Sequence, residues 1–267
     1  MTDQSERMQN ISENMGKIKN KILVMSGKGG VGKSTVAVNL AVSLTYQGFK
    51  TGLLDIDLHG PNVVKMLGIN KKLGISENGK ISPVEIPGEL KVVSLASYVD
   101  QGDPVIWRGP MKTTAIYQFL GDVQWGDLDF LIIDSPPGTG DESLTILQTI
   151  PDLQALIVTT PQEVALVDVR RAINFVKKMM RKPIGIVENM SYLICDKCGN
   201  KMNVFGEGGG KRIAEEFDLP LLGQLPLNPE VNVKADKGES IIVGMRDTEM
   251  ERAFNDLTSN ILQRVEL

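Results

Sequence analysis

The chain has few of the residues on which disulfide-rich proteins and histidine metal sites depend. Its 267 residues include one histidine and two cysteines, and aromatic residues make up only 5%. Two cysteines do not make a disulfide framework, and no second histidine is present to share a metal with the first. These absences favour a reducing, intracellular compartment, so a cytoplasmic protein is expected.

The sequence also lacks a basic excess and long apolar runs. Its net charge of -4 does not favour nucleic acid or an anionic membrane surface. No apolar run reaches the length of a membrane-spanning helix, and the polar first twenty residues lack the apolar segment of a secretory signal. We therefore expect neither nucleic acid nor a membrane as a partner.

Short apolar runs, rich in β-branched residues, alternate with segments of helical spacing. The apolar runs are 21–26, 51–57, 91–96, 129–136, 155–160, 183–190 and 221–227, and the helical segments are 33–48, 111–121, 142–150, 163–180 and 247–265. This alternation favours a mostly parallel sheet covered by helices on both faces. We predict a doubly wound α/β fold with a single domain over 21–267, preceded by a flexible leader over residues 1–20.

The strongest motif, GKGGVGKST, lies between the first predicted strand and the first predicted helix. It fits G-x-x-x-x-G-K-[ST], the phosphate-binding loop of P-loop NTPases, in the strand–loop–helix context that this motif requires. Glycines let backbone N–H groups surround phosphate oxygens, and the helix N-terminus adds its dipole. Lys33 is expected to reach the β- and γ-phosphates of ATP, and Ser34 to ligate Mg²⁺. The predicted nucleotide-binding loop comprises Gly27, Lys28, Gly29, Gly30, Val31, Gly32, Lys33, Ser34 and Thr35.

Carboxylates follow two of the other predicted strands. The run LLDID ends with Asp55 and Asp57, and DFLIID ends with Asp134. Side chains at the carboxyl ends of parallel strands face the ligand crevice of such folds. Asp134 is expected to hold Mg²⁺, through water, whereas Asp55 stays open between a Mg²⁺ role and a structural hydrogen bond.

A second lysine in the loop, Lys28, could stabilise charge as the γ-phosphate leaves. With this lysine, KGGVGKST resembles the deviant Walker A loop of the ParA/MinD-type ATPases, which include the nitrogenase iron protein. The resemblance implies a homodimer in which Lys28 of one subunit contacts the nucleotide of the other. It also implies that Asp57 orients or activates the attacking water, that Asn189 contacts adenine, and that Pro226 packs near the base. The expected catalytic residues are Lys28, Lys33 and Asp57.

Both cysteines lie in one motif, CDKC, followed by Gly-Asn. The spacing C-x-x-C is typical of metal ligands, but a structural zinc or an iron–sulfur cluster takes four ligands. Two-fold symmetry places the same patch on both subunits of a dimer, so Cys195 and Cys198 near the axis would give four thiolates. Thiolates suit Zn²⁺ and iron–sulfur clusters alike, and a redox-dependent bridge between the two cysteines also stays open.

Seven motifs occur in one order over residues 20 to 240: SGKGGVGKST, DxDxHGP, WRGP, IDSPPGTGD, TTPQEVAL, ENMS and CDKCG. Together they resemble the Mrp/ApbC P-loop proteins, which are iron–sulfur cluster carriers or scaffolds. The resemblance implies a slow, Mg²⁺-dependent ATPase that holds a [4Fe–4S] cluster between two subunits and transfers it to apo iron–sulfur proteins. Some members carry an N-terminal four-cysteine cluster, which this chain does not contain, so only the bridging cluster is expected.

Three alternatives compete with this hypothesis. A MinD/ParA-like spatial-positioning ATPase explains the loop, but not C-x-x-C, and 247–267 is not a basic amphipathic helix. A dimer clamped by structural zinc would use the same four thiolates, while nitrogenase-type electron transfer uses cysteines far apart in sequence. No role is assigned to His59, Arg108 or Asn228. The simplest interpretation is a hydrogen bond for His59 and a surface salt bridge for Arg108. Many family members carry Asp in place of Asn228.

Overall fold

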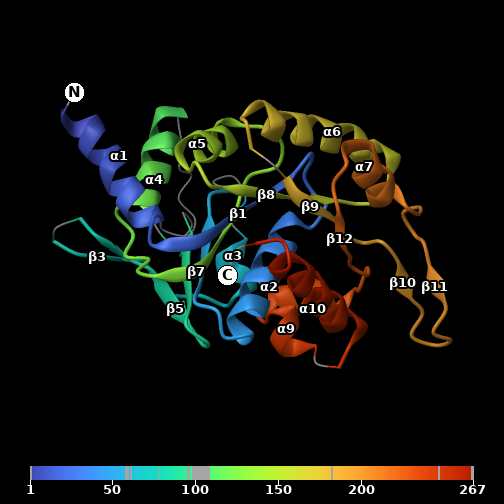
Figure 1. Cartoon of the computed structure of the whole chain (residues 1–267). Helices are drawn as coiled ribbons and strands as arrows, with labels where there is room; N and C mark the ends of the chain where they lie inside the picture. Colours follow the sequence, from blue (N-terminus) through green and yellow to red (C-terminus); the bar gives the residue numbers. More distant parts are fainter. Residues whose placement is uncertain are drawn as a thin grey trace.

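The computed structural model describes residues 2–57, 60, 62–77, 79–94, 97, 109–181, 183–245 and 247–265. Eight strands form the main sheet in the order β12-β9-β8-β1-β7-β2-β6-β5 (Figure 1). They are β1 (Ile18–Ser26), β2 (Thr51–Asp55), β5 (Val84–Ile86), β6 (Leu90–Ser94), β7 (Leu128–Asp134), β8 (Gln154–Thr159), β9 (Pro183–Glu188) and β12 (Leu221–Gln224). Neighbours run parallel except β5, which is antiparallel to β6 at one edge. The predicted mostly parallel α/β sheet is confirmed.

Helices cover both faces of the sheet (Figure 1). One side carries α2 (Lys33–Tyr46), α3 (Val63–Met66), α8 (Glu230–Asp236), α9 (Ile241–Gly244) and α10 (Glu249–Leu262). The other side carries α1 (Thr2–Met15), α4 (Gly109–Gly121), α5 (Asp141–Thr149), α6 (Glu163–Lys178) and α7 (Gly209–Phe217). Because both faces are covered, each central strand contains a continuous apolar run: ILVM in β1, FLII in β7 and ALIV in β8.

The N-terminal segment, for which the sequence predicts a flexible leader, contains a helix. Residues Thr2–Met15 form helix α1, and Ile11 and Met15 are buried where α1 packs against α4. Asn14 Nδ2 donates to two carbonyl oxygens at the end of α4, at 2.7 and 2.9 Å. The helix is hard to recognise in the sequence, because two buried apolar side chains on an otherwise polar helix give only a weak periodic pattern.

Two small antiparallel hairpins stand outside the main sheet. They are β3 (Gly74–Ile75) with β4 (Ile81–Ser82), and β10 (Leu193–Ile194) with β11 (Lys201–Met202). The second projects from the body of the protein beside β12 (Figure 1). In the described part of the chain, no helix is both long and apolar enough to cross a membrane.

Candidate functional site

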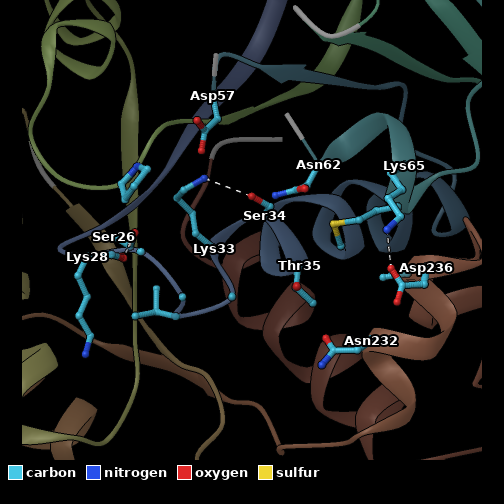
Figure 2. Close-up of a pocket in the computed structure, with 17 residues that line it drawn as sticks. Ser26, Lys28, Lys33, Ser34, Thr35, Asp57, Asn62, Lys65, Asn232 and Asp236 are labelled. Carbon is cyan, nitrogen blue, oxygen red and sulfur yellow. Dashed lines mark hydrogen bonds and ion pairs between the residues drawn. The ribbon is translucent and has the colours of Figure 1, made fainter. Parts of the chain in front are cut away.

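The loop between β1 and α2 forms one wall of a cavity of about 520 Å³, a size typical of small-molecule sites (Figure 2). Residues 28–35 line this wall, and Asp57 lies above it. The loop follows the carboxyl end of β1, where the parallel strands deliver their terminal side chains to one edge of the sheet. The cavity therefore occupies the place where the sequence predicts the nucleotide.

Lys33 is buried, and its ammonium group lies among the polar groups predicted to handle phosphate and metal. Lys33 Nζ forms an ion pair with Asp134 and lies 3.4 Å from Ser34 Oγ. Figure 2 shows this ammonium group directed toward Ser34 and Asp57. The structure thus brings together three residues that the sequence assigns to different parts of the nucleotide site.

Asp134 has the features of a cation ligand. Burial raises the pKa of this carboxyl, while the neighbouring Lys33 opposes the shift. Its Oδ2 atom is buried and has no hydrogen-bond partner among the residues that the structure describes. Such an atom calls for an explanation, and carboxylate and hydroxyl oxygens are ligands that Mg²⁺ accepts. Asp134 and Ser34 therefore fit the predicted Mg²⁺ site.

Asp55 and Asp57 follow β2 but have different surroundings. Asp55 is fully buried, and accepts hydrogen bonds from Asp57 N and Ser94 Oγ, both at 2.9 Å. Burial first, and then the charge of Asp134, raise the pKa of Asp55 to about 8. Asp57 lines the cavity, and its Oδ1 accepts from Gly60 N at 3.2 Å. Asp57 can therefore face the ligand, while Asp55 supports it from behind.

Two glycines of the loop stand where a side chain would collide with the protein. A Cβ on Gly27 would lie 2.3 Å from the carbonyl carbon of Asp168 in α6. Gly32 has φ +81°, and its Cβ would lie 2.1 Å from Asn189 Nδ2. The same Nδ2 donates to Val31 O at 2.9 Å, so Asn189 supports the loop from outside the cavity. These close contacts explain why the loop needs glycine at both positions.

Lys28 and Lys33 leave the loop in different directions. The Lys28 side chain points away from Lys33 and out of the loop (Figure 2). Its carbonyl oxygen accepts from Ser26 Oγ at 3.0 Å, which helps to fix the start of the loop. A lysine in this orientation is available to a second molecule on that side.

The opposite wall of the cavity comes from α3 and α8, which the sequence analysis did not identify. Its residues are Asn62, Lys65, Met66, Asn232, Ala235 and Asp236. Lys65 Nζ lies 2.7 Å from Asp236 Oδ1 and joins the two helices (Figure 2). Next to this ion pair the backbones touch, since a Cβ on Gly238 would lie 2.4 Å from Gly68 Cα. Both helices are too short to give a periodic pattern, so only the Gly68 and Gly238 turns could have marked their ends.

Four other residues that the sequence analysis named lie away from the cavity or cannot be placed. Pro226 is buried in the segment after β12, outside the cavity lining, so the predicted contact with the base stays a prediction. Asn228 Oδ1 accepts from Glu230 N at 2.9 Å, a local bond that forms an Asx-type turn just before α8. His59 and Arg108 lie outside the residues that the structure describes.

The C-x-x-C motif occupies the tip of the β10–β11 hairpin. Cys195 is half-buried and Cys198 is exposed. Cys195 N donates to Asn200 O at 3.0 Å, and Gly199 N donates to Cys195 O at 2.8 Å, so the turn is ordered by its own backbone. Hydrogen bonds from the N–H groups of Lys197 and then Cys198 lower the pKa of the Cys195 thiol, which favours the metal-binding thiolate.

One copy of the chain offers only these two thiolates at the hairpin. Across the described residues, no group of three or more His, Cys, Asp or Glu side chains is placed to hold a metal ion. A four-ligand site at this hairpin therefore needs ligands from another molecule.

Comparison with solved structures relates the chain to nucleotide-binding proteins. A nucleotide-binding protein from Archaeoglobus fulgidus, solved in complex with ADP and with cobalt detected, matches with a TM-score of 0.77 and 37% identity. The match covers 87% of this chain and 92% of that protein. The cell division ATPase MinD from Pyrococcus furiosus matches with a TM-score of 0.68 over 92% of this chain and 99% of its own. At 22% identity, the likeness to MinD is one of fold alone.

Comparison of sequences gives a narrower relationship. An iron–sulfur cluster carrier protein from Pyrococcus horikoshii is 47% identical, over 96% of this chain and 90% of its own length. The cytosolic Fe–S cluster assembly factor CFD1 from Kluyveromyces lactis is 44% identical, over 94% of this chain and 93% of its own. The family model for ParA proteins described as NUBPL iron-transfer P-loop NTPases matches residues 17–262. The chain therefore belongs to the ParA family of P-loop NTPases, in its NUBPL iron-transfer group.

Proposed function

We propose that this protein is an ATP-dependent iron–sulfur cluster carrier that acts as a homodimer in the cytoplasm. In this proposal, two copies hold one [4Fe–4S] cluster between them and transfer it to apo iron–sulfur proteins. The observation that carries the proposal is a pair of free cysteines at a hairpin tip, half of a four-ligand site, on a P-loop NTPase fold. Relatives that are 44% and 47% identical and bear cluster-assembly or cluster-carrier names support the same function.

The nucleotide site supports ATP binding by the loop and slow hydrolysis. Residues 28–35, with the N-terminus of α2, line the cavity, and a loop of this kind binds phosphate oxygens through its backbone N–H groups. Lys33 exchanges its ion pair with Asp134 for contacts with the β- and γ-phosphates. Ser34 and Asp134 would hold Mg²⁺, which neutralises charge on the phosphate oxygens when bound.

Asp57 and Lys28 are proposed to act on the transferred phosphoryl group. Asp57 lies on the cavity wall, where its carboxylate can orient the attacking water. Lys28 points out of its own loop, consistent with a role at the nucleotide of a second copy. Asn189 and Pro226 are proposed to lie near adenine. Hydrolysis is expected to be slow, because the site lacks the second copy's lysine until two chains meet.

The cluster is the cargo of the protein. Cys195 and Cys198 from each of two hairpins would supply the four thiolates of one [4Fe–4S] cluster. Thiolate chemistry also accepts Zn²⁺ in the same place, and we expect protein that is purified in air to hold zinc or no metal there. The exposed position at a hairpin tip supports release of the cluster to an acceptor protein.

Anaerobic reconstitution with iron and sulfide tests the proposal. We expect about four irons and four sulfides per dimer, the count of a Cys₄-ligated [4Fe–4S] cluster. Cys195→Ser or Cys198→Ser should remove iron and sulfide together, while Met202→Ala, an exposed change on the same hairpin, should keep both. The shared site is wrong if the double cysteine variant keeps a full cluster, or if a monomer binds one alone at low concentration.

A further inference from the structure

Tyr192 joins the C-x-x-C hairpin (residues 193–202) to the body of the protein through three separate contacts. Lys201 Nζ of β11 lies 3.8 Å above the centroid of the Tyr192 ring. The Tyr192 hydroxyl donates to Glu249 Oε1 of α10 at 3.1 Å. The Tyr192 carbonyl oxygen accepts from Leu227 N at 2.6 Å. Tyr192 as a whole is only 8% exposed, so it is held in place by the residues around it.

The hairpin needs such an anchor because its own structure is small. Its ladder consists of two residue pairs, Leu193 with Met202 and Ile194 with Lys201. An isolated two-stranded hairpin is marginally stable at best in water. Leu193 and Ile194 are half-buried and Met202 is 42% exposed, so no residue of the two strands is fully buried against the body. Its direction therefore depends on contacts at its base, where Tyr192 lies.

The contacts of Tyr192 have the chemistry of a firm attachment. An ammonium group over an aromatic face is attracted by the ring quadrupole, which ties β11 to the ring. A hydroxyl that donates to a carboxylate makes a charge-assisted hydrogen bond, which ties the ring to α10. Burial, and then Glu249, raise the pKa of Tyr192 to about 12, so the hydroxyl stays protonated as the donor.

The chain immediately before Tyr192 is equally well fixed. Ser191 N donates to Leu225 O at 2.9 Å, and Ser191 Oγ donates to Glu188 Oε1 at 2.8 Å. Asn189 Nδ2 holds Val31 O of the phosphate loop. Tyr192 is thus the last fixed residue before the hairpin and stands three positions before Cys195.

We propose that Tyr192 is a positioning residue for the cysteine pair: with Lys201 and Glu249, it holds the C-x-x-C hairpin at one angle to α10. The two thiolates of each copy are then presented in a fixed direction, as a site assembled from two hairpins requires. The importance of this positioning role rests on the proposed function, since only a shared metal site needs the hairpin direction to be fixed.

The first test needs no metal. Hydrogen–deuterium exchange of amides 193–202 is measured in the metal-free full chain. We expect Tyr192→Leu to speed exchange there about tenfold, while Tyr192→Phe and Lys201→Met each remove one contact and give a smaller increase. The matched control is Tyr46→Leu, at an exposed tyrosine of α2, which should leave hairpin exchange unchanged. Equal exchange in the native protein, Tyr192→Leu and Lys201→Met would overturn the proposal.

The second test uses Co²⁺ alone as the probe of the paired thiolates. Thiolate-to-cobalt charge-transfer absorption gives the Co²⁺ affinity, and the affinity for ATP is measured on the same samples. We expect Tyr192→Leu to weaken Co²⁺ binding about tenfold, with Tyr192→Phe intermediate, and ATP affinity unchanged within about twofold. Parallel losses of Co²⁺ affinity, ATP affinity and melting temperature in Tyr192→Leu and Lys201→Met would indicate general unfolding and overturn the positioning role.

The two tests separate this inference from the proposed function. If the native protein binds no Co²⁺ through its cysteines, the shared metal site is wrong, and the exchange measurement still decides whether Tyr192 fixes the hairpin. If Co²⁺ binds but is indifferent to Tyr192 and Lys201, the shared site stands and the positioning role fails.

Discussion

Gly27→Ala should damage the nucleotide site more than the same change two residues later in the loop. The added Cβ would lie 2.3 Å from the carbonyl carbon of Asp168 and 2.5 Å from Val169 N. Both atoms belong to the backbone of α6, so no side chain can rotate to make room. The loop and α6 must separate by about 1 Å to restore ordinary van der Waals contact.

The collision can be relieved by movement of α6 or by movement of the loop, and each movement costs stability or ATP affinity. If α6 moves, it lifts the apolar side by which it packs against the sheet, and overpacking of this kind costs about 1–3 kcal/mol. This side comprises Ala165, Leu166, Val169, Ala172, Ile173 and Val176. For a chain of 267 residues, the change corresponds to a fall in Tm of roughly 2–5 °C. If the loop moves, the phosphate cradle is displaced, and we expect a loss of about tenfold or more in ATP affinity, ~1.4 kcal/mol.

Gly29→Ala is the matched control, because the nearest atom to its added Cβ is Pro137 Cγ at 4.0 Å. The assay is thermal unfolding of the nucleotide-free protein, followed by titration with a fluorescent ATP analogue. We expect Gly27→Ala to lose stability, affinity or both, while Gly29→Ala keeps the native Tm. If the two variants melt at the same temperature and bind with the same affinity, the steric argument for Gly27 is refuted.

Three further predictions concern the charged groups of the cavity. Lys33→Ala should abolish ATP binding, whereas Asp57→Ala should keep the affinity within about tenfold and slow hydrolysis; hydrolysis at the native rate in Asp57→Ala would contradict its proposed role. Asp55 has a pKa of about 8 in the folded protein, above its unfolded value of 3.8, so the folded state binds an extra proton between these values. Stability of the nucleotide-free protein should therefore fall as pH rises through this window, and urea unfolding of Asp55→Asn at pH 5 and pH 8 should show a smaller fall. Lys65→Ala breaks an ion pair whose side chains are 65% and 70% exposed, so it should lower the free energy of unfolding in urea by less than about 1 kcal/mol. A much larger loss would show that the pair does more than join α3 to α8.

The central sheet could be predicted because its long strands contain continuous apolar runs. Seven predicted runs coincide with β1, β2, β6, β7, β8, β9 and β12, and the five predicted helices coincide with α2, α4, α5, α6 and α10. The elements that the sequence analysis missed are short or mostly polar, such as α1, α3 and α8. For α3 and α8, the distance along the chain adds to the difficulty, since Lys65 and Asp236 meet only in the folded protein.

In the site, too, residues that belong to sequence motifs could be predicted, and residues that depend on tertiary contacts could not. Lys33, Ser34 and Asp134 could be found because each belongs to a motif whose spacing reflects its chemistry, and the structure brings them together. The role of Tyr192 could not be found, because its contacts with Lys201 and Glu249 depend on how a hairpin is set against a distant helix. A tyrosine in a sequence does not show which surface it will join.

The nucleotide cavity is completed from the far end of the chain, because Asn232 and Asp236 of α8 share the wall opposite residues 28–35 with α3. During synthesis on the ribosome, the phosphate loop and α3 emerge long before α8, and for most of that time one wall of the cavity is incomplete. A ligand stabilises only the state that offers its complete site. ATP can therefore assist the folding of this protein only in the last stage of translation, and the earlier part of the chain must hold its parallel sheet together without help from the nucleotide.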